Sequence, residues 1–579
     1  MRPPSLACAV ALLLLLPGPA ATCPLAQATR RVDLGLGGAV PDAPVMVRGI
    51  AGNGRFVLLE SAATNLVADD TNELTDLFVR DLLRGENERV SVDRAGAQGA
   101  GGSRNGTISA DGRFVAFESG AALVADDTNG VQDVYLRDRE RHLTIRVSVD
   151  EQGGQAARPS EWGSVSADGR HVAFNSPAHM TADDVDNVND VFVRDRDPDG
   201  DGDLDGQAIT VRLSRPFAGD RANGGSFFPR ISGNGRRVVF HGLAWNLAPG
   251  DTNGDWDVFV RDRDPDGDGV LDESDAVTAI LSVSSTGVQG RRASRDASID
   301  HEGRHAAFWS DSGNLVPGDT NRASDVFVRD LVLRTTVRVS LDAAGREGDN
   351  ASLIPALSAD GRFVAFVSMA TNLVAGDTNG RPDVFVHDRD PDGDALFDEG
   401  NGLIRRESLS PFDVQGAGSH TLAFLSADGR RVAFQSSLAD LEPGAAPSAG
   451  AVYLRDRIRL SPLGGPERDL GFRLEGAFGQ EARTVQVLLS ASETQLGSVL
   501  KGAWVPLLPD RWTVLSLGRL RAVIDAGGAA VIPIPASSLG PGPLPPSLRA
   551  AALVLARDEA GAWPVTPPVA LGPQQNDDL

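Results

Sequence analysis

Cysteine is almost absent from this chain of 579 residues. Its two cysteines, Cys8 and Cys23, lie near the N-terminus, so no disulfide can form within the mature chain and another device must stiffen its loops. Lysine is scarcer still. Because Lys501 is the only lysine, a Schiff-base or P-loop mechanism would depend on this one residue.

Aromatic residues are also few, at 5% of the chain, whereas 65 glycines and 35 prolines interrupt it. Many turns and few bulky side chains favour an all-β fold. Apolar residues reach 41%, which is enough for a packed core and excludes general disorder. Basic residues are in deficit, and the net charge of −24 argues against nucleic acid and anionic lipid as partners.

Long apolar runs are missing beyond the N-terminus. Residues 1–28 have the features of a secretory signal peptide: Arg2, the apolar stretch Leu6–Leu16, and small residues near Ala20 and Ala28. That stretch is too short to span a membrane. We therefore expect an exported chain in the periplasm, on the cell surface or outside the cell, with no transmembrane segment after cleavage. A lipoprotein site at Cys23 is an alternative.

One pattern recurs seven times along the chain. It consists of a turn S-A-D-G-R, an apolar run F-V-A-F, a loop N-L-V-x-G-D-T-N-G, a run D-V-F-V-R-D and a final R-V-S-V-D. Each unit predicts four short strands, illustrated in the second unit by Thr107–Ser109, Phe114–Phe117, Val134–Arg137 and Ile145–Val149. Seven four-stranded units predict a seven-bladed β-propeller over residues 29–461. The turn glycines are Gly54, Gly112, Gly169, Gly235, Gly303, Gly361 and Gly429.

The two ends of the array predict how the ring closes. The seventh unit lacks a good fourth strand, while R-R-V-D-L-G-L-G-G at 30–38 resembles the fourth strand of the first unit. We expect the N-terminal segment to complete the last blade and so protect its edge. Two recurring apolar positions are predicted as core: Leu59, Phe117, Phe174, Phe240, Phe308, Phe366 and Phe434, and Phe78, Tyr135, Phe192, Phe259, Phe327, Phe385 and Tyr453.

The segments S-A-D-G-R-F-V-A-F at 109–117 and D-V-F-V-R-D at 257–262 resemble the TolB-type (PD40, WD-like) propeller repeats of exported bacterial proteins. This resemblance covers roughly residues 29–461 and implies a propeller fold. It implies little about function, because propellers carry many different functions.

An acidic segment, D-P-D-G-D-G-V-L-D-E-S-D at 264–275, carries the strongest chemical signal. Hard cations need several oxygens that converge on one point, and this spacing of carboxylates around a turn glycine supplies them. The segment resembles the calcium loops of EF-hand, dockerin and thrombospondin-type repeats, although its last position is Asp and not Glu. The predicted calcium ligands are Asp264, Asp266, Asp268, the Val270 carbonyl, Asp272 and Asp275.

Two sister segments, 197–208 and 390–401, follow the same pattern less closely. The first ends in Ala208; the second has Ala395 in place of the turn glycine and ends in Asn401. Their predicted ligands are Asp197, Asp199, Asp201, Asp203 and Asp205, and Asp390, Asp392, Asp394 and Asp398. We predict that calcium is the cofactor of all three segments; the alternative is solvated acidic loops.

A second acidic pattern, D-T-N-G-x-x-D, lies between the second and third strands of six units. One interpretation is an Asx-turn that satisfies loop amides, and the other is a further ring of cation sites. In an antiparallel blade these loops belong at the opposite end of the sheet from the three D-P-D-G segments. The acidic pairs are Asp70/Asp76, Asp127/Asp133, Asp184/Asp190, Asp251/Asp257, Asp319/Asp325 and Asp377/Asp383, with Asp186 replacing Asn in the third unit.

After the repeats, short apolar runs between Pro and Gly predict a small β-sandwich-like domain over residues 462–573, followed by a polar tail at 574–579.

Motifs of enzymes are missing from the chain. It has no G-x-S-x-G, H-E-x-x-H or Walker loop, and His171 and His305 share one strand position, which indicates packing. We therefore predict a non-catalytic module that binds a protein or polysaccharide of the bacterial envelope. The alternatives are a polysaccharide lyase or glycosidase, since TolB-like propellers include oligogalacturonate lyases, or a structural surface protein.

Overall fold

The computed structural model describes residues 28–204, 206–217, 219, 221–411, 413–437, 441 and 450–457, together with strands at 459–462, 469–478, 481–490, 523–524, 530–531 and 549–550. Only Ala28 of the predicted signal peptide falls within this part of the chain. Two compact units are present; one is Thr29–Arg455, and the other contains the remaining residues.

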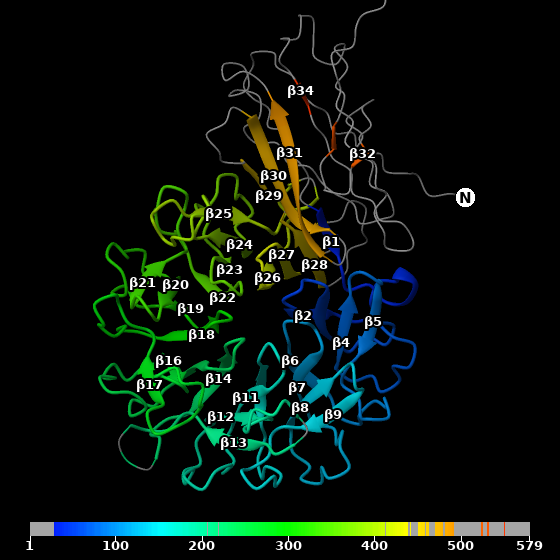
Figure 1. Ribbon diagram of the computed structural model, residues 1–579, viewed down its shortest axis with the longest axis vertical. Helices are drawn as coiled ribbons and strands as arrows, with labels where there is room; N and C mark the ends of the chain where they lie inside the picture. The colour runs from blue at the N-terminus through cyan, green and yellow to red at the C-terminus, as the bar shows by residue number, and fades with distance from the viewer. Residues whose placement is uncertain are drawn as a thin grey trace, which may run out of the picture. The chain divides into compact units, whose positions relative to one another are not determined.

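The unit Thr29–Arg455 is a ring of seven four-stranded antiparallel sheets, shown in Figure 1. We number these blades 1 to 7 along the chain. Their strands are β2 (Val45–Ile50), β3 (Phe56–Ser61), β4 (Asp76–Asp81) and β5 (Glu86–Arg89); β6 (Ser103–Ile108), β7 (Phe114–Ser119), β8 (Asp133–Asp138) and β9 (Leu143–Arg146); β10 (Glu161–Val165), β11 (His171–Ser176), β12 (Asp190–Asp195) and β13 (Ile209–Arg212); β14 (Ser226–Ile231), β15 (Arg237–Gly242), β16 (Asp257–Asp262) and β17 (Val277–Ile280); β18 (Ser294–Ile299), β19 (His305–Ser310), β20 (Asp325–Asp330) and β21 (Thr335–Arg338); β22 (Ser352–Leu357), β23 (Phe363–Ser368), β24 (Asp383–Asp388) and β25 (Leu403–Arg406); and β26 (His420–Leu425), β27 (Arg431–Ser436), β28 (Ala451–Asp456) and β1 (Ala28–Arg31).

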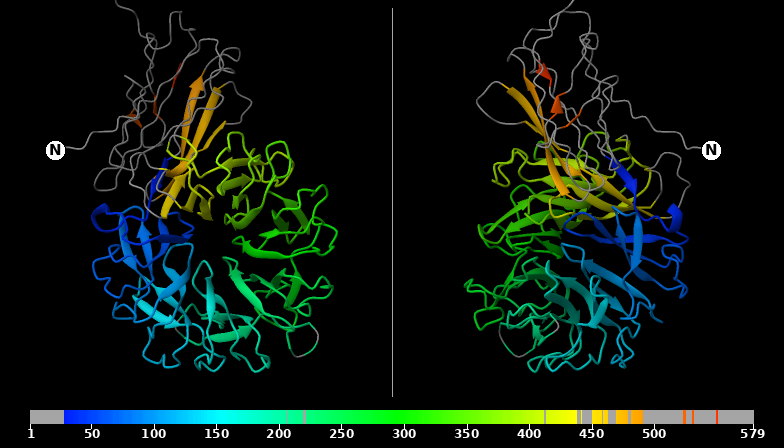
Figure 2. Two further views of the ribbon diagram at one scale, coloured as in Figure 1. Left: turned by 180° about the vertical axis from the view of Figure 1, so that it is seen from behind. Right: turned by 45° about the vertical axis from the view of Figure 1, so that its right-hand side comes forward.

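This architecture confirms the predicted all-β, seven-bladed propeller. The first strand of each blade is innermost and contacts the first strands of both neighbouring blades, all the way round the ring (Figure 2). The predicted closure is also confirmed. Strand β1 lies next to β28 in the last sheet, and the backbone N–H of Val32 donates to the carbonyl of Val452 at 2.9 Å.

The core lies between neighbouring blades and consists of the predicted apolar positions. Phe174 faces Phe192 across strands β11 and β12, and both side chains are fully buried. Their ring centroids lie 5.8 Å apart, and equivalent pairs recur in five other blades at 5.7–5.9 Å. Such stacked pairs stabilise a blade beyond the area that they bury.

The fourth strand begins and ends earlier than predicted. In blade 2 the expected strand was Ile145–Val149, whereas β9 is Leu143–Arg146. After Arg146 the pairing becomes irregular. The N–H groups of Val147 and Ser148 both donate to the carbonyl of Val134, while the Ser148 hydroxyl accepts the N–H of Val134 and donates to Asp133. The seven turn glycines all have positive φ, between 64° and 80°, as a tight hairpin requires.

The second unit contains a sheet of β29 (Arg459–Pro462), β30 (Asp469–Phe478), β31 (Glu481–Ser490) and β34 (Arg549–Ala550), and a pair β32 (Val523–Ile524) and β33 (Ala530–Val531). The predicted β-sandwich stays a prediction, because the residues between these strands and the tail 574–579 lie outside the described residues. Among the described residues, no helix is long and apolar enough to cross a membrane.

Candidate calcium loops and acidic rim loops

The three predicted calcium segments connect the third and fourth strands of blades 3, 4 and 6. They lie beside the turns between the first and second strands, as the antiparallel topology requires. The Nη1 atoms of Arg196, Arg263 and Arg389, each just before a segment, donate to the turn carbonyls of Gly169, Gly235 and Gly361 at 2.6–2.8 Å. We call the segments 197–208, 264–275 and 390–401 the insert loops.

Each insert loop brings its first three aspartates together. Within each set, one carboxylate oxygen from each residue lies within 4.8 Å of the others. The first aspartate is buried and the other two are exposed, so the cluster opens to solvent. The three clusters are Asp197, Asp199 and Asp201; Asp264, Asp266 and Asp268; and Asp390, Asp392 and Asp394.

A tight turn holds each cluster in place. In the blade 4 loop, the carboxylate of Asp264 accepts the N–H groups of Gly267 at 2.8 Å and of Gly269 at 3.3 Å. Gly269 has φ +90°, which an L side chain rarely adopts. In the blade 6 loop this position is Ala395, which nevertheless keeps φ +70° and donates to Asp390 at 3.2 Å.

The predicted ligands at the ninth position have another partner. Asp272 forms two hydrogen bonds with Arg263, at 2.6 and 2.9 Å, and Asp398 pairs in the same way with Arg389. These acids therefore fasten the loop to its blade and are not part of the aspartate cluster. The equivalent Asp205 lies outside the described residues.

The remaining predicted ligands lie around the clusters. In the blade 6 loop, Asn401 at the last position donates to Asp392 at 3.1 Å. In the blade 4 loop, the charges of Asp268 and then Asp275 raise the pKa of the neighbouring Glu273. Asp203 and Val270 contribute backbone N–H groups to the third clustered aspartate of their loops, at 2.8 Å. The negative charge is thus concentrated at one point of each loop.

The donor set of these loops suits a hard cation. It consists of carboxylate oxygens, which calcium prefers, with no soft sulfur ligand. Asp197 gives a direct test of the fit: it is 94% buried, and its Oδ1 has no hydrogen-bond partner within the described part of the chain. A buried carboxylate oxygen without a partner is costly, and a bound cation would satisfy it.

The six D-T-N segments, which we call the rim loops, lie at the other end of the sheets. Each forms the predicted Asx-turn, in which the third side chain accepts a backbone N–H two residues later at 2.8–3.1 Å. The amide of Asn72 also donates to the carbonyl of Gly99, which joins this loop to the connection between blades 1 and 2. Loop geometry thus favours the turn interpretation.

A guanidinium group takes the position of a cation in five of the rim loops. In blade 5, Arg338 from strand β21 lies 3.5 Å from Asp319 and 3.1 Å from Asp325. Burial and the neighbouring Asp325 still raise the pKa of Asp319 to about 6. The five arginines are Arg89, Arg146, Arg212, Arg338 and Arg406.

Side chains around the ring axis were missed by the sequence analysis. The innermost strand of six blades contains a bulge whose residue has φ of about +50°. These residues are Asn105, Trp162, Phe228, Asp296, Ile354 and Leu422. The residue type at the bulge position varies from blade to blade, whereas the core positions are constant, and this variation could have pointed to a functional surface. The predicted first strand, Thr107–Ser109, begins after this position and so did not include it.

The bulge residues form a mixed aromatic and charged surface. Trp162 and Phe228 have ring centroids 4.0 Å apart, and Phe228 lies 4.9 Å from His241. Burial lowers the pKa of Arg230. The charge of Asp296 on blade 5 raises this pKa, and the charge of Arg48 on blade 1 lowers it further. Because these charges come from separate blades, they face the axis of the ring.

The two histidines at the shared strand position pack as predicted. His171 and His305 are 98% and 97% buried, and each lies beside the aspartate that ends the next strand, Asp195 at 3.3 Å and Asp330 at 3.4 Å. They fill the position that Phe114 occupies in blade 2.

Comparison with known proteins identifies no family for this chain. No protein-family model and no curated protein match the chain. A solved structure of a protein assigned as TolB, from Agrobacterium tumefaciens, is 14% identical, with 72% of this chain and 90% of that chain covered and a TM-score of 0.29. The seven-bladed propeller itself is established by the strand order within the sheets of this chain.

Two further similar structures are peptidases. An acylaminoacyl peptidase from Pyrococcus horikoshii is 10% identical, with 74% of this chain and 57% of that chain covered and a TM-score of 0.38. A post-proline cleaving enzyme from Rickettsia typhi is 7% identical, with 78% and 58% covered and a TM-score of 0.41. This chain therefore spans little more than half the length of either peptidase.

These peptidases overturn the prediction that the chain is not an enzyme. That prediction rested on missing catalytic motifs, whereas the matching folds belong in part to enzymes. The propeller fold alone therefore does not decide whether the protein is a binding module or an enzyme. The missing catalytic motifs do not decide it either.

Proposed function

We propose that this protein is an exported, calcium-stabilised propeller that binds a protein or polysaccharide of the bacterial envelope. The observation that carries the proposal is the set of three aspartate clusters in the insert loops, each with three carboxylates within 4.8 Å. Calcium in such loops would replace the missing disulfides. Loops of this kind in extracellular proteins bind calcium in the range of about 0.1–1 mM.

Export is supported by the N-terminal sequence and by the chemistry of the loops. A calcium site of that affinity would be filled outside the cytoplasm. The surface around the ring axis supports recognition of a ligand with flat apolar groups, because the rings of Trp162 and Phe228 lie together there, tilted by 40°, beside charged side chains.

Calcium binding is tested by titration of chelator-treated protein. Isothermal calorimetry should give about three sites, and Asp199→Asn, Asp266→Asn and Asp392→Asn should each remove one. Glu140→Gln is the matched control: Glu140 lies in the same connection of blade 2, which has no insert, and its side chain is 71% exposed. Absence of saturable binding would overturn the proposal.

Partner binding is tested by capture on the immobilised propeller from solubilised envelope. Bound proteins and glycans should be retained in calcium and should decrease with Trp162→Ala. Trp245→Ala is the matched control, because Trp245 is 58% exposed and lies between β15 and β16, ahead of the rim loop of blade 4. Equal retention by both variants would show that the axial surface is not the binding site.

A further inference from the structure

Blade 4 differs from the other blades that carry a rim loop at the last residue of its fourth strand. In the other five blades that carry a rim loop, the last residue of the fourth strand is an arginine whose guanidinium lies at the acidic pair. In blade 4 this residue is Ile280, which faces Phe259 as Arg406 faces Phe385 in blade 6. The acidic pair Asp251 and Asp257 is nevertheless retained.

The contacts of the guanidinium define a constant binding position. In blade 1, Arg89 donates to the side chain of Gln98 at 2.7 Å and to the carbonyl of Asp69 at 2.8 Å. Its Nη1 also lies 3.3 Å from Asp70. In the other four blades the arginine contacts the carbonyl at the equivalent position of its own rim loop; these arginines are Arg146, Arg212, Arg338 and Arg406. Each guanidinium thus meets one carbonyl and the first acid of the pair, and in four of the five blades it also pairs with the second acid.

Blade 4 keeps all of these acceptors. Asp251 and Asp257 are at most 8% exposed, and Gln289 and Gly250 correspond to Gln98 and Asp69 of blade 1. Gln289 donates to Asp251 at 2.8 Å and to Asp257 at 2.7 Å.

These amide bonds do not replace a guanidinium. Gln415 makes the same two bonds to Asp377 and Asp383 in blade 6, where Arg406 is also present. Glutamine and arginine therefore contact the pair together in blade 6, and blade 4 has only the glutamine.

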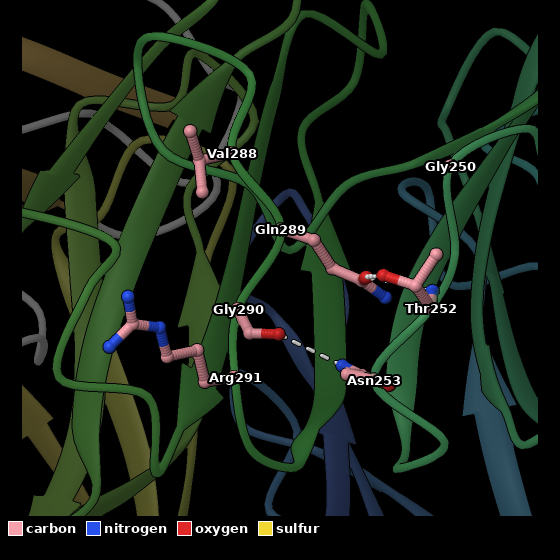
Figure 3. A pocket seen from close by; sticks show the side chains of 7 residues that line it. All are labelled: Gly250, Thr252, Asn253, Val288, Gln289, Gly290 and Arg291. Carbon is pink, nitrogen blue, oxygen red and sulfur yellow. Dashed lines mark hydrogen bonds between the residues drawn. The ribbon is translucent and has the colours of Figure 1, made fainter.

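A depression of about 420 Å³ opens at this position, between the rim loop and the connection to blade 5 (Figure 3). Gly250 and Gln289 are among its lining residues, and they are counterparts of the groups that bind the guanidinium in blade 1. The lining residues are Gly250, Thr252, Asn253, Val288, Gln289, Gly290 and Arg291. The depression thus lies beside the acidic pair and shares Gly250 and Gln289 with the position that corresponds to the guanidinium site of blade 1.

Arg291 is the one basic residue among those that line the depression. It stands where other blades have Ala100, Ala157 or Asp349. In Figure 3 its guanidinium points away from Thr252 and Asn253. Among the described residues, no arginine or histidine lies within ion-pair distance of Asp251 or Asp257.

We propose that the rim loop of blade 4 binds the guanidinium group of a ligand, in the position that an arginine of the chain itself occupies in five other blades. A planar guanidinium has five N–H donors that suit paired carboxylates and a carbonyl. A metal ion suits the position less, because Asp257 already accepts from Ser282 at 2.6 Å, Asn253 at 2.8 Å and Gln289. This site is independent of the insert loops.

Ligand-observed NMR on the full chain in calcium tests this proposal. Ethylguanidinium is the probe, ethylurea the neutral control and ethylammonium the control for charge alone. We expect saturable binding of ethylguanidinium in the millimolar range and at least tenfold weaker binding of both controls. An arginine tripeptide and its citrulline counterpart distinguish the sources: tighter binding of the arginine peptide indicates a peptide ligand, whereas binding of ethylguanidinium alone indicates a small molecule.

Matched variants make the result decisive. Ile280→Arg should fill the position and reduce binding at least tenfold, and Asp251→Asn should do the same if the arginine variant does not fold. Arg406→Ile in blade 6 should create a second site and double the stoichiometry. Equal binding to wild type and Ile280→Arg would overturn the proposal. So would binding that appears only in Arg291→Ala, because Arg291 would then be the natural occupant.

Discussion

At the scale of single residues, arginine acts as an internal cation throughout this propeller. Among the residues that the structure describes, the largest fully buried side chains are those of Arg212, Arg263, Arg389 and Arg455. Each meets an acid: Arg455 lies 2.9 Å from Glu407, and Arg263 lies 2.6 Å from Asp272. A planar guanidinium donates to a carboxylate through two N–H groups and to a backbone carbonyl from a third nitrogen in one rigid geometry, as Arg263 does with Asp272 and Gly235. Arginine and lysine are therefore not interchangeable at these sites.

Replacing one of these arginines should leave a buried charge unpaired. We predict that Arg263→Met lowers the free energy of unfolding by about 3 kcal/mol, since it removes the partner of Asp272. Arg84→Met is the control, because Arg84 is 68% exposed and its nearest acid is 3.9 Å away; it should change stability by less than about 0.5 kcal/mol. Urea titration measures both. A small effect of Arg263→Met would show that the pair contributes little.

The left-handed backbone conformation of Ala395 leads to a second prediction, on the stability and calcium affinity of its loop. An alanine with positive φ is strained by about 1–2 kcal/mol relative to glycine. We predict that Ala395→Gly stabilises the blade 6 insert loop and tightens its calcium binding severalfold in calorimetry. Gly269→Ala in the blade 4 loop is the reverse change and should weaken calcium binding there. If both variants bind as the wild type does, the turn does not limit affinity.

At the scale of elements, the rim loops link the blades through buried carboxylates. Burial raises the pKa of Asp257 to about 6, with the charge of Asp251 adding to the shift. The folded protein therefore keeps this proton up to about pH 6, whereas an unfolded aspartate loses it near pH 3.8. Between these values the folded state binds more protons, so stability must fall as the pH rises.

Asp257→Asn should remove this pH dependence. The contribution is on the order of 2–3 kcal/mol, and it is fully present below about pH 4 and lost above about pH 6. Urea titrations at pH 4, 5, 6 and 7 should show the wild type losing stability relative to the variant over this range. A difference between the two proteins that stays constant with pH would contradict the raised pKa.

Most strands and turns could be predicted from the sequence, because the same weak pattern of apolar and turn residues recurs in all seven units. The positions of Phe174 and Phe192, the turn glycines and the closure by β1 all follow from alternation and turn chemistry that recur in each unit. The early end of β9 could not be predicted, because the irregular pairing of Val147 and Ser148 with Val134 leaves no mark in the pattern of apolar residues.

The candidate sites were predicted less completely than the fold. The spacing of Asp264, Asp266 and Asp268 predicts their cluster, since a turn glycine brings them to one point. It does not predict that Asp272 pairs with Arg263, because that contact depends on where the blade places the arginine. Likewise, the open guanidinium position of blade 4 becomes visible only when Ile280 is aligned in space with the arginines of other blades.

At the scale of the whole molecule, the acidic charge is concentrated in two sets of loops at opposite ends of the sheets. The rim loops are largely neutralised by arginines from the chain, except in blade 4. The insert loops carry acids and no base within 197–208, 264–275 and 390–401, so each aspartate cluster keeps an excess of negative charge that needs a counter-ion, although Arg362 of the blade lies 3.8 Å from Asp390. The proposed calcium ions would supply it, and they would do so in a chain without disulfides in its propeller.

The thermal stability of chelator-treated protein with and without calcium tests this central claim most directly. We predict that about 10 mM calcium raises the melting temperature of the wild type, since a site with a dissociation constant of about 0.1 mM is then at a hundredfold excess and adds roughly 2.7 kcal/mol. The triple variant Asp199→Asn, Asp266→Asn and Asp392→Asn should lose this gain, while Glu140→Gln keeps it and magnesium does not reproduce it. A melting temperature of the wild type that does not change with calcium would contradict the claim.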